Sequence, residues 1–560
     1  MKTFLRFLTL ILTTGLAFAG SPKISKDLDG KKASDMVDVI IQFTRIPTDK
    51  EDTKVKDKGG KLKAKLNVVK GGLYSLPVAA LETLAADSDV VYISPDRTVN
   101  GALDYANATV GASIAASYGW DGTGIGVAVV DSGVATVNDL KNGSSSRVLY
   151  SQNFASGSTA YYGHGTHVAG IIGGNGSMST GAAYTATFRG IAPKVSFISL
   201  RVLNGDGTGT DSSVIAAIQR AIELKSTYNI RIINLSLGRP VFESYTVDPL
   251  CLAVESAWNA GIVVVVSAGN EGRNNSQGTN GYATIKSPGN DPYVITVGAM
   301  KTMGSLIRTD DLIASYSSKG PTAIDHIVKP DLVAPGNAII SLLASTNVTL
   351  YTPTNAIPLS YYKPGSTGNS PNYFRLSGTS MAAPMVSGAA ALLLQKTPSL
   401  TPDQVKARLM KTASKAFPTT SIATDPVTGQ LYTSQYDIFT VGAGYLDIAA
   451  ALLANNDTAT VKAISPKVVY DPVTHHAHLV HGDGLIWGDG LIWGDGLIWG
   501  DSMVWGDGLI WGDGLIWGDS MVWGDSTTQG FSLIWGDSLI WGDTTTTSGE
   551  STSVAVQGEN

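Results

Sequence analysis

The segment "GIGVAVVDSG", residues 124–133, is a run of small and branched apolar residues that ends at Asp131. Three further segments share this pattern: residues 195–203, 230–237 and 261–269. Because the runs lack polar alternation, they predict strands that are buried on both faces, as in parallel sheets. Helical stretches separate them, at residues 210–228 and 251–260. This alternation predicts a doubly wound α/β domain with a mostly parallel sheet, whose chemistry gathers where strands end.

Composition and charge narrow the classes to which the chain can belong. Its 560 residues are 43% hydrophobic and 15% charged, which suffices for a large core and more than one domain. The net charge of −6 is far from the basic balance of nucleic-acid-binding proteins, so we expect no nucleic-acid partner. The single cysteine, Cys251, excludes a disulfide within the chain, so stability must come from packing or bound ions.

The first twenty residues, "MKTFLRFLTLILTTGLAFAG", have the order of a signal peptide. Lys2 and Arg6 precede an apolar run, and Ala17 and Ala19 supply the small residues of a cleavage site. The alternative is a buried or membrane helix, but the run is short for a span. We therefore predict a signal peptide over residues 1–19, a secreted or cell-surface protein, and no membrane span after its removal.

Residues 20–100 have the pattern of a separate small unit. The segments "VDVIIQF" and "DVVYISPDRTV" predict strands, and "LYSLPVAALETLAA" includes a short amphipathic helix. A basic, polar stretch, "KVKDKGGKLKAK", lies between them. These patterns predict a small α+β domain ahead of the larger α/β domain.

Four segments place reactive side chains beside predicted strand ends or helix starts. They hold Asp131 in "VAVVDSGV", His164 in "GHGTHVAGII", Asn270 in "VVSAGNEG" and Ser380 in "GTSMAAP". A serine hydroxyl becomes a good nucleophile when a base takes its proton and a carboxylate orients that base. The alternative is that Ser380 is only a helix N-cap, Asp131 a turn residue and Asn270 a loop residue with local hydrogen bonds.

These motifs, in the order Asp, His, Ser, resemble those of the subtilisin-like serine proteases, the subtilase family (peptidase S8). Further family-like segments are "INLSLG" (233–238), "SYSSKGP" (315–321) and "KPDLVAPG" (329–336). The resemblance implies that Ser380 is the nucleophile, His164 the general base and later acid, and Asp131 the residue that orients His164. Asn270 and the backbone N–H of Ser380 would stabilise the oxyanion.

The resemblance also implies partners for a catalytic domain over residues 101–455. Extended protein or peptide substrates would pair with a backbone edge formed by Ser236, Leu237 and Gly238. The side chain before the scissile bond would enter a pocket lined by Ala268 and Gly269. The unit at 20–100 is similar to the family's inhibitory propeptide and would be the chain's own intramolecular inhibitor. Together these features predict a secreted zymogen: a serine endopeptidase that works through an acyl-enzyme and requires no cofactor for its chemistry.

Several positions depart from the family pattern. Met385 follows "GTSMAAP" where the family often has histidine, and this position is not one of the reacting groups. Residues 337–375 are longer than usual and rich in Tyr, Pro, Ser and Asn, which predicts a loop near the substrate cleft. Members of the family commonly bind calcium, so the resemblance leaves a structural calcium ion open. Asp139 matches one ligand position, but the loop at 173–188 does not match the family's partner loop, so the metal ligands are not assigned. His167, close to His164 on the same helix, is interpreted as structural.

The chain beyond residue 455 changes composition three times. We predict a linker over 456–481, and we interpret its "HHAHLVH" as polar linker, not as a zinc or nickel site. Residues 482–543 repeat "GDGLIW" or "GDSMVW" and hold ten aspartates. Their even period suits stacked β-strands, while a flexible adhesive array and a duplication without a stable fold stay open. Residues 544–560 are predicted to be disordered. If the repeats carry the main function, the chain is instead a surface-display or binding protein.

Overall fold

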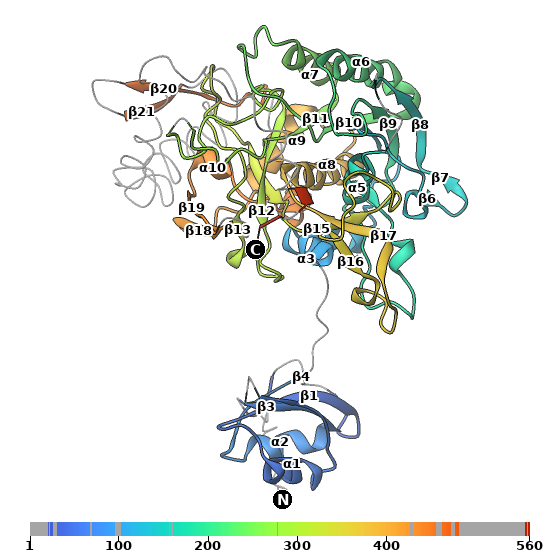
Figure 1. Cartoon of the computed structure of the whole chain (residues 1–560), viewed down its shortest axis with the longest axis vertical. Helices are drawn as coiled ribbons and strands as arrows, with labels where there is room; N and C mark the ends of the chain where they lie inside the picture. The colour runs from blue at the N-terminus through green and yellow to red at the C-terminus, as the bar shows by residue number, and fades with distance from the viewer. Residues whose placement is uncertain are drawn as a thin grey trace, which may run out of the picture. The chain divides into compact units, whose positions relative to one another are not determined.

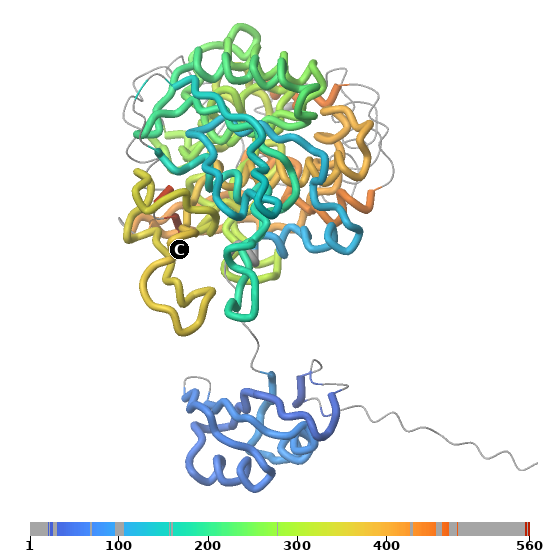
Figure 2. The backbone as a smooth tube through the Cα atoms, turned by 90° about the vertical axis from the view of Figure 1, so that its right-hand side faces the viewer, coloured from blue at the N-terminus to red at the C-terminus, as the bar shows by residue number. Residues whose placement is uncertain are grey.

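The computed structural model describes most of the chain between residues 21 and 480, and part of its last segment. The described residues are 21, 23–25, 28, 31–67, 70–95, 102–155, 157, 161–276, 278–425, 429–454, 462–471, 476–480, 555–556 and 558–559. The predicted signal peptide and the repeat array lie outside them. The chain divides into two compact units, Met1–Val99 and Asn100–Asn560; Figures 1 and 2 show the first in blue and the second in colours from lighter blue to red.

The first unit is a small α+β fold, as its sequence predicts. A four-stranded antiparallel sheet has the order β2-β3-β1-β4, with β1 at Met36–Phe43, β2 at Lys61–Leu66, β3 at Gly71–Pro77 and β4 at Val90–Pro95. Two helices accompany it, α1 (Asp49–Lys56) and α2 (Leu81–Ala85). Helix α1 begins with a capping box, in which Thr48 and Glu51 bond to each other's backbone N–H groups. The basic stretch in the sequence thus becomes the end of α1 and strand β2.

The second unit is built on an eight-stranded, mostly parallel sheet. Its path is β13-β12-β11-β10-β5-β9-β8, with β14 paired to β12, and only β13 runs antiparallel to its neighbour. The strands are β5 (Gly126–Asp131), β8 (Val148–Asn153), β9 (Ser196–Arg201), β10 (Ile230–Leu235), β11 (Val263–Ser267), β12 (Ile295–Lys301), β13 (Leu312–Ile313) and β14 (Leu332–Pro335). The four predicted strands are confirmed as β5, β9, β10 and β11. Since β9 and β10 lie on opposite sides of β5, the strand order reverses there, which is where α/β folds place their sites.

Two groups of helices cover the sheet. Helices α6 and α7 contact each other and the strands β5, β9, β10 and β11, while α5 and α8 contact each other and the sheet (Figure 1). Their bounds are α5 His164–Gly173, α6 Asp211–Tyr228, α7 Pro249–Asn259 and α8 Thr379–Lys396. The remaining helices are α3 (Ala102–Thr109), α4 (Ser113–Ser117), α9 (Pro402–Thr412), α10 (Ile438–Val441) and α11 (Ile448–Leu453).

Two segments contain more regular structure than the sequence suggests. Residues 337–375, expected as a loop, contribute to a three-stranded antiparallel sheet of β15 (Ile339–Leu342), β17 (Asn369–Leu376) and β16 (Ala356–Pro358). The predicted linker contains a hairpin of β20 (Lys467–Asp471) and β21 (His476–Val480), which resembles a second hairpin, β18 (Thr420–Thr424) with β19 (Leu431–Gln435). The strand β20 is tied to the unit because Val468 N–H donates to the carbonyl of His326. Short strands at β6 (Lys141–Asn142) and β7 (Ser145–Ser146) form one more pair.

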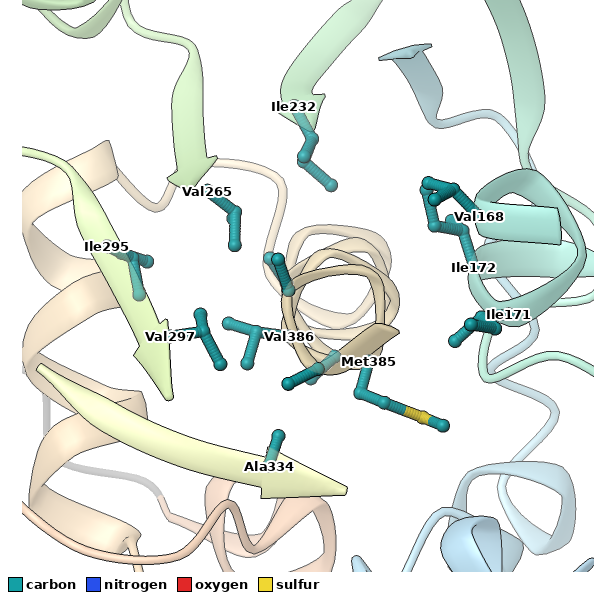
Figure 3. Packing of buried hydrophobic residues seen from close by; sticks show 14 of the residues in the cluster. Val168, Ile171, Ile172, Ile232, Val265, Ile295, Val297, Ala334, Met385 and Val386 are labelled. Carbon is teal, nitrogen blue, oxygen red and sulfur yellow. The ribbon is translucent and has the colours of Figure 1, made fainter. Parts of the chain in front are cut away.

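Helix α8 lies in the apolar core of the second unit (Figure 3). Its Val386 and Met385 are fully buried, and Figure 3 shows them among side chains of α5 and of the sheet. The labelled neighbours are Val168, Ile171, Ile172, Ile232, Val265, Ile295, Val297 and Ala334. Met385, the departure noted in the sequence, is therefore a core residue. The packing fixes α8, and with it the serine at its start.

Candidate active site

The carboxylate of Asp131 and the imidazole of His164 form a buried pair. His164 Nδ1 lies 2.8 Å from Asp131 Oδ2 and 2.9 Å from Oδ1. Asp131 is the last residue of β5 and is fully buried, and Ser132 N–H also donates to its Oδ1 at 2.6 Å. A carboxylate in this position holds the proton of the imidazole on Nδ1, which leaves Nε2 as the nitrogen that can accept a proton.

The close approach of this pair requires glycine after His164. A Cβ on Gly165 would lie 2.6 Å from the carbonyl oxygen of Gly133 and 3.1 Å from Asp131 Oδ1. The backbone N–H of Gly165 donates to Ser132 Oγ at 3.0 Å, which ties the first turn of α5 to the end of β5. The glycines around His164 in the sequence thus reflect contact between helix and strand.

Ser380 lies in the first turn of α8 and is bound to the end of β10. Its Oγ donates to the carbonyl of Ser236 at 3.2 Å, and Ser236 Oγ donates to the carbonyl of Ser380 at 2.9 Å. Two further side-chain hydrogen bonds extend this network into the core: Asn234 Nδ2 donates to Ser236 Oγ, and Ser387 Oγ donates to Asn234 Oδ1. These reciprocal bonds fix the serine against the sheet, while Ser380 as a whole residue is partly exposed.

Asn270 faces the same helix start from the loop after β11. Its Oδ1 accepts hydrogen bonds from Thr379 N–H at 2.9 Å and from Thr379 Oγ1 at 3.1 Å. Thr379 Oγ1 in turn accepts from Gly269 N–H at 3.1 Å. Because the side-chain oxygen is engaged as an acceptor, the amide Nδ2 is what Asn270 can offer as a donor beside Ser380.

The predicted substrate-binding residues lie at two neighbouring strand ends. Ser236, Leu237 and Gly238 directly follow β10, and Gly238 is exposed. Ala268 and Gly269 directly follow β11, which pairs with β10 in parallel, so the two segments lie side by side. Ala268 is fully buried and pairs its backbone with Val297 and Lys286.

His167, on the same helix as His164, is held by packing and by a backbone contact. His167 is fully buried, its Nε2 lies 3.1 Å from the carbonyl of Ile339, and its ring packs edge-on against Phe374. Burial, with His164 as a smaller cause, lowers the pKa of His167 to about 3 and keeps the ring neutral. This environment agrees with the structural interpretation of His167.

The carboxylate of Asp139 is bound by proton donors and does not fit a calcium ion. Its Oδ1 accepts from Ser177 Oγ at 2.9 Å and Met178 N–H at 2.7 Å, and its Oδ2 accepts from Tyr373 OH at 2.6 Å. Calcium needs six to eight oxygen ligands with lone pairs directed at it, whereas these groups direct hydrogens at the carboxylate. Within the described residues, no group of three or more His, Cys, Asp or Glu could hold a metal. Calcium elsewhere in the chain stays a prediction.

Sequence reasoning missed the polar residues that support the predicted ones. Thr379 holds Asn270, Ser132 holds Gly165, and Asn234 with Ser387 links β10 to α8. Thr379 and Ser132 lie next to predicted residues within the quoted motifs. Asn234 and Ser387 could have been noticed because each is a polar residue flanked by apolar or small residues within a predicted strand or helix.

A buried Asp–His pair, a serine at a helix start and an amide donor beside it are the parts of a serine hydrolase. The model of the subtilase family, Peptidase_S8, matches residues 122–435. Serine protease AprX of Bacillus subtilis (strain 168) is 36% identical over 371 residues, which cover 64% of this chain and 78% of AprX. Subtilisin E of the same strain is 32% identical over 418 residues, covering 73% of this chain and 91% of the relative. The chain belongs to the subtilase family and is a serine protease.

One of the solved structures that the chain resembles is fervidolysin from Fervidobacterium pennivorans, described as a keratinolytic enzyme related to subtilisin. It has a TM-score of 0.46 and 24% sequence identity, over 77% of this chain and 62% of fervidolysin. The described part of the chain contains no helix with the length and hydrophobicity that crossing a bilayer requires.

Proposed function

We propose that the protein is a secreted serine endopeptidase that cleaves peptide bonds through an acyl-enzyme on Ser380. The observation that carries the proposal is the Asp131–His164 pair, with both carboxylate oxygens within 2.9 Å of Nδ1. This pair prepares Nε2 as a base and stabilises the imidazolium that forms. Helix α5, which carries His164, contacts helix α8, which begins beside Ser380.

The reaction follows from these parts. The Ser380 hydroxyl turns from the Ser236 carbonyl to His164 Nε2, gives up its proton, and its Oγ attacks the substrate carbonyl carbon. Asn270 Nδ2 and the Ser380 N–H donate to the oxyanion. His164 then delivers the proton to the leaving amine nitrogen, and the acyl–Oγ ester remains. Water gives a proton to His164 and attacks the ester carbonyl carbon. The C–Oγ bond then breaks, His164 returns the proton to Ser380 Oγ, and the acyl product leaves as a carboxylic acid.

The predicted substrate-binding residues have a backbone role in this proposal. The segments after β10 (Ser236, Leu237 and Gly238) and after β11 (Ala268 and Gly269) would bind extended peptide, with the side chain before the scissile bond between them. Gly238 suits such pairing because the residue is exposed to solvent.

The first unit would act as an inhibitory propeptide that is removed after export. Its support is its position between the predicted signal peptide and the catalytic unit, and its folding as a separate compact α+β unit. The alternative, a surface-display protein whose repeats carry the function, concerns residues outside the described part of the chain and stays a prediction.

The test is labelling of the processed protein with a fluorophosphonate probe, with the adduct located by mass spectrometry. We expect one adduct on Ser380 and none on Ser387, which lies buried on the same helix. The His164→Ala variant should lose the adduct because the hydroxyl then lacks its base. Folded, processed protein without an adduct on Ser380, or with equal labelling in His164→Ala, would overturn the proposal.

A further inference from the structure

The carboxylate of Glu559, far beyond the repeats, lies in a pocket of the catalytic unit. Its Oε1 is 2.9 Å from Lys301 Nζ at the end of β12, and its Oε2 is 3.1 Å from Arg273 Nη2. Ser315 donates to Oε2 twice, from its backbone N–H at 2.8 Å and its Oγ at 2.7 Å. The side chains of Glu559, Lys301 and Arg273 are 0%, 5% and 6% exposed. Such burial is stable only where the charges are paired and the lone pairs are satisfied.

The groups that contact the Glu559 carboxylate are themselves held by further contacts. Arg273 is itself fixed, because its Nε donates to Ser315 Oγ at 2.8 Å and its Nη1 pairs with Asp425 at 2.5 Å. The ring of Tyr432 lies 5.0 Å from the guanidinium carbon. Two cations and two donors from Ser315 thus converge on the carboxylate from the catalytic unit.

The backbone of the same segment is also bound. The side-chain amide of Asn337 pairs with Glu559 in both directions, its Oδ1 accepting from the N–H at 2.9 Å and its Nδ2 donating to the carbonyl at 2.6 Å. Ser377 N–H, at the end of β17, donates to the carbonyl of Ala555 at 3.0 Å. Val556 packs against the main core. In Figure 1 this short red segment is seen near α8 and β15.

A glycine is required next to the anchoring glutamate. Gly558 has φ +67°, and a Cβ there would lie 2.4 Å from Ser377 Oγ and 3.2 Å from Asn337 Oδ1. Since Ser377 Oγ also accepts from Ala338 N–H at 2.9 Å, it is not free to move aside. The site therefore requires glycine at position 558 and a carboxylate at position 559.

We propose that Ala555, Val556, Gly558 and Glu559 form an intramolecular ligand, the tail latch, for a carboxylate-binding site made by Arg273, Lys301, Ser315, Asn337 and Ser377. Val480 of β21 is the last described residue before the repeats, and Ala555, which is bound to Ser377, is the first described residue after them. The repeat-bearing segment is therefore attached to the unit at both ends. A single cut within it leaves its distal part bound through the tail latch.

In the experiment, the chain is cut after the repeats, and we measure whether the segment that contains the tail latch remains bound to the catalytic unit. A recognition sequence for a site-specific endopeptidase is inserted between Asp543 and Thr544 of the full chain, in the Ser380→Ala background that prevents self-cleavage. After cutting, native mass spectrometry follows loss of the distal segment over time. Glu559→Gln and Gly558→Ala are compared with Glu550→Gln, the matched charge change in the same tail.

We expect the wild-type and Glu550→Gln segments to remain bound. The Glu559→Gln segment should dissociate about tenfold faster or more, because a hydrogen-bonded buried charge is lost from the contact. Gly558→Ala should also be released faster. Equal release of all four segments would overturn the proposal.

A second measurement covers the case in which the Glu559→Gln chain does not fold. Thermal unfolding of the uncut variants establishes whether each is folded. Nicked wild-type protein is then mixed with an isotope-labelled synthetic peptide of residues 551–560, which should exchange into the site. The same peptide with Gln at position 559 should not exchange, and equal exchange of both peptides would contradict the site.

Discussion

Substitution of Asn270 separates its two roles in the structure. The side-chain oxygen holds Thr379 through hydrogen bonds of 2.9 and 3.1 Å, and the amide nitrogen is the proposed donor to the oxyanion. Asn270→Ala removes both groups. Asn270→Asp keeps an oxygen acceptor for Thr379, removes the donor and adds a negative charge where the oxyanion develops.

The two variants should therefore rank oppositely in rate and in stability. Loss of one oxyanion donor lowers kcat by about 10²–10³, or about 2.7–4 kcal/mol. Asn270→Asp should be slower still, since two like charges about 4 Å apart repel by about 4 kcal/mol at an effective dielectric constant of about 20. Asn270→Ala should lose more stability, because the N–H of Thr379 loses its acceptor, at a cost of about 1–3 kcal/mol.

The assay is turnover of a fluorogenic peptide amide, with kcat and KM measured separately, alongside urea unfolding of the same variants. KM should change little because the donor acts mainly on the transition state. Two results would refute the reasoning: Asn270→Ala turning over within about threefold of wild type, or Asn270→Asp turning over faster than Asn270→Ala.

Two further predictions concern stability. Tyr373→Phe removes the donor to buried Asp139 Oδ2, so unfolding should become easier by about 1.5–3 kcal/mol. Asp139→Asn should leave any effect of calcium on urea unfolding unchanged, and loss of a calcium effect in that variant would contradict this assignment of Asp139. His167 has a pKa near 3 when folded and near 6.5 when unfolded, so the unfolded state binds its proton first and stability falls as pH drops through this window. The contribution is about 1.4 kcal/mol per pH unit, or about 2 kcal/mol between pH 6.5 and 5, and His167→Gln should flatten that slope in pH-dependent urea unfolding.

The parallel sheet could be predicted from the sequence because its strands are buried on both faces. A nearly continuous apolar run such as Gly126–Asp131 is stable mainly where both faces of the strand are buried. Its composition alone therefore indicates a central strand of a covered sheet. The pairing of Asp131 with His164 was also predictable, since one ends a central strand and the other begins the following helix. The local sequence pattern predicts a segment's structure correctly where the environment that the pattern favours is also the one that the fold provides.

The three-stranded sheet within residues 337–375 lacked such a signal. Strand β17, Asn369–Leu376, alternates between exposed and buried positions with Pro, Asn and Tyr among them, a composition typical of loops. It forms a strand because Ile339–Leu342 pairs with it in register and Arg375 N–H donates to the carbonyl of Asn355. Tertiary pairing therefore outweighed local propensity.

The tail latch shows the same limit at a greater sequence separation. The stretch from 544 to 560 was predicted to be disordered because its composition offers little apolar surface to bury. Glu559 is nevertheless held by groups 244 and 286 residues earlier, at Ser315 and Arg273. No window of the sequence contains both the anion and its cations, so no local pattern could indicate the site.

The tail latch and the nucleophile share one segment of backbone. Ser377 N–H donates to the carbonyl of Ala555, and the next residue, Gly378, donates to the carbonyl of Gly336. These bonds fix the chain immediately before α8, whose first turn carries Ser380. A segment from the far side of the repeats therefore supplies one of the hydrogen bonds that hold the entry to the nucleophile helix. The repeats are consequently joined to the protease by a contact beside its active site as well as by the peptide chain.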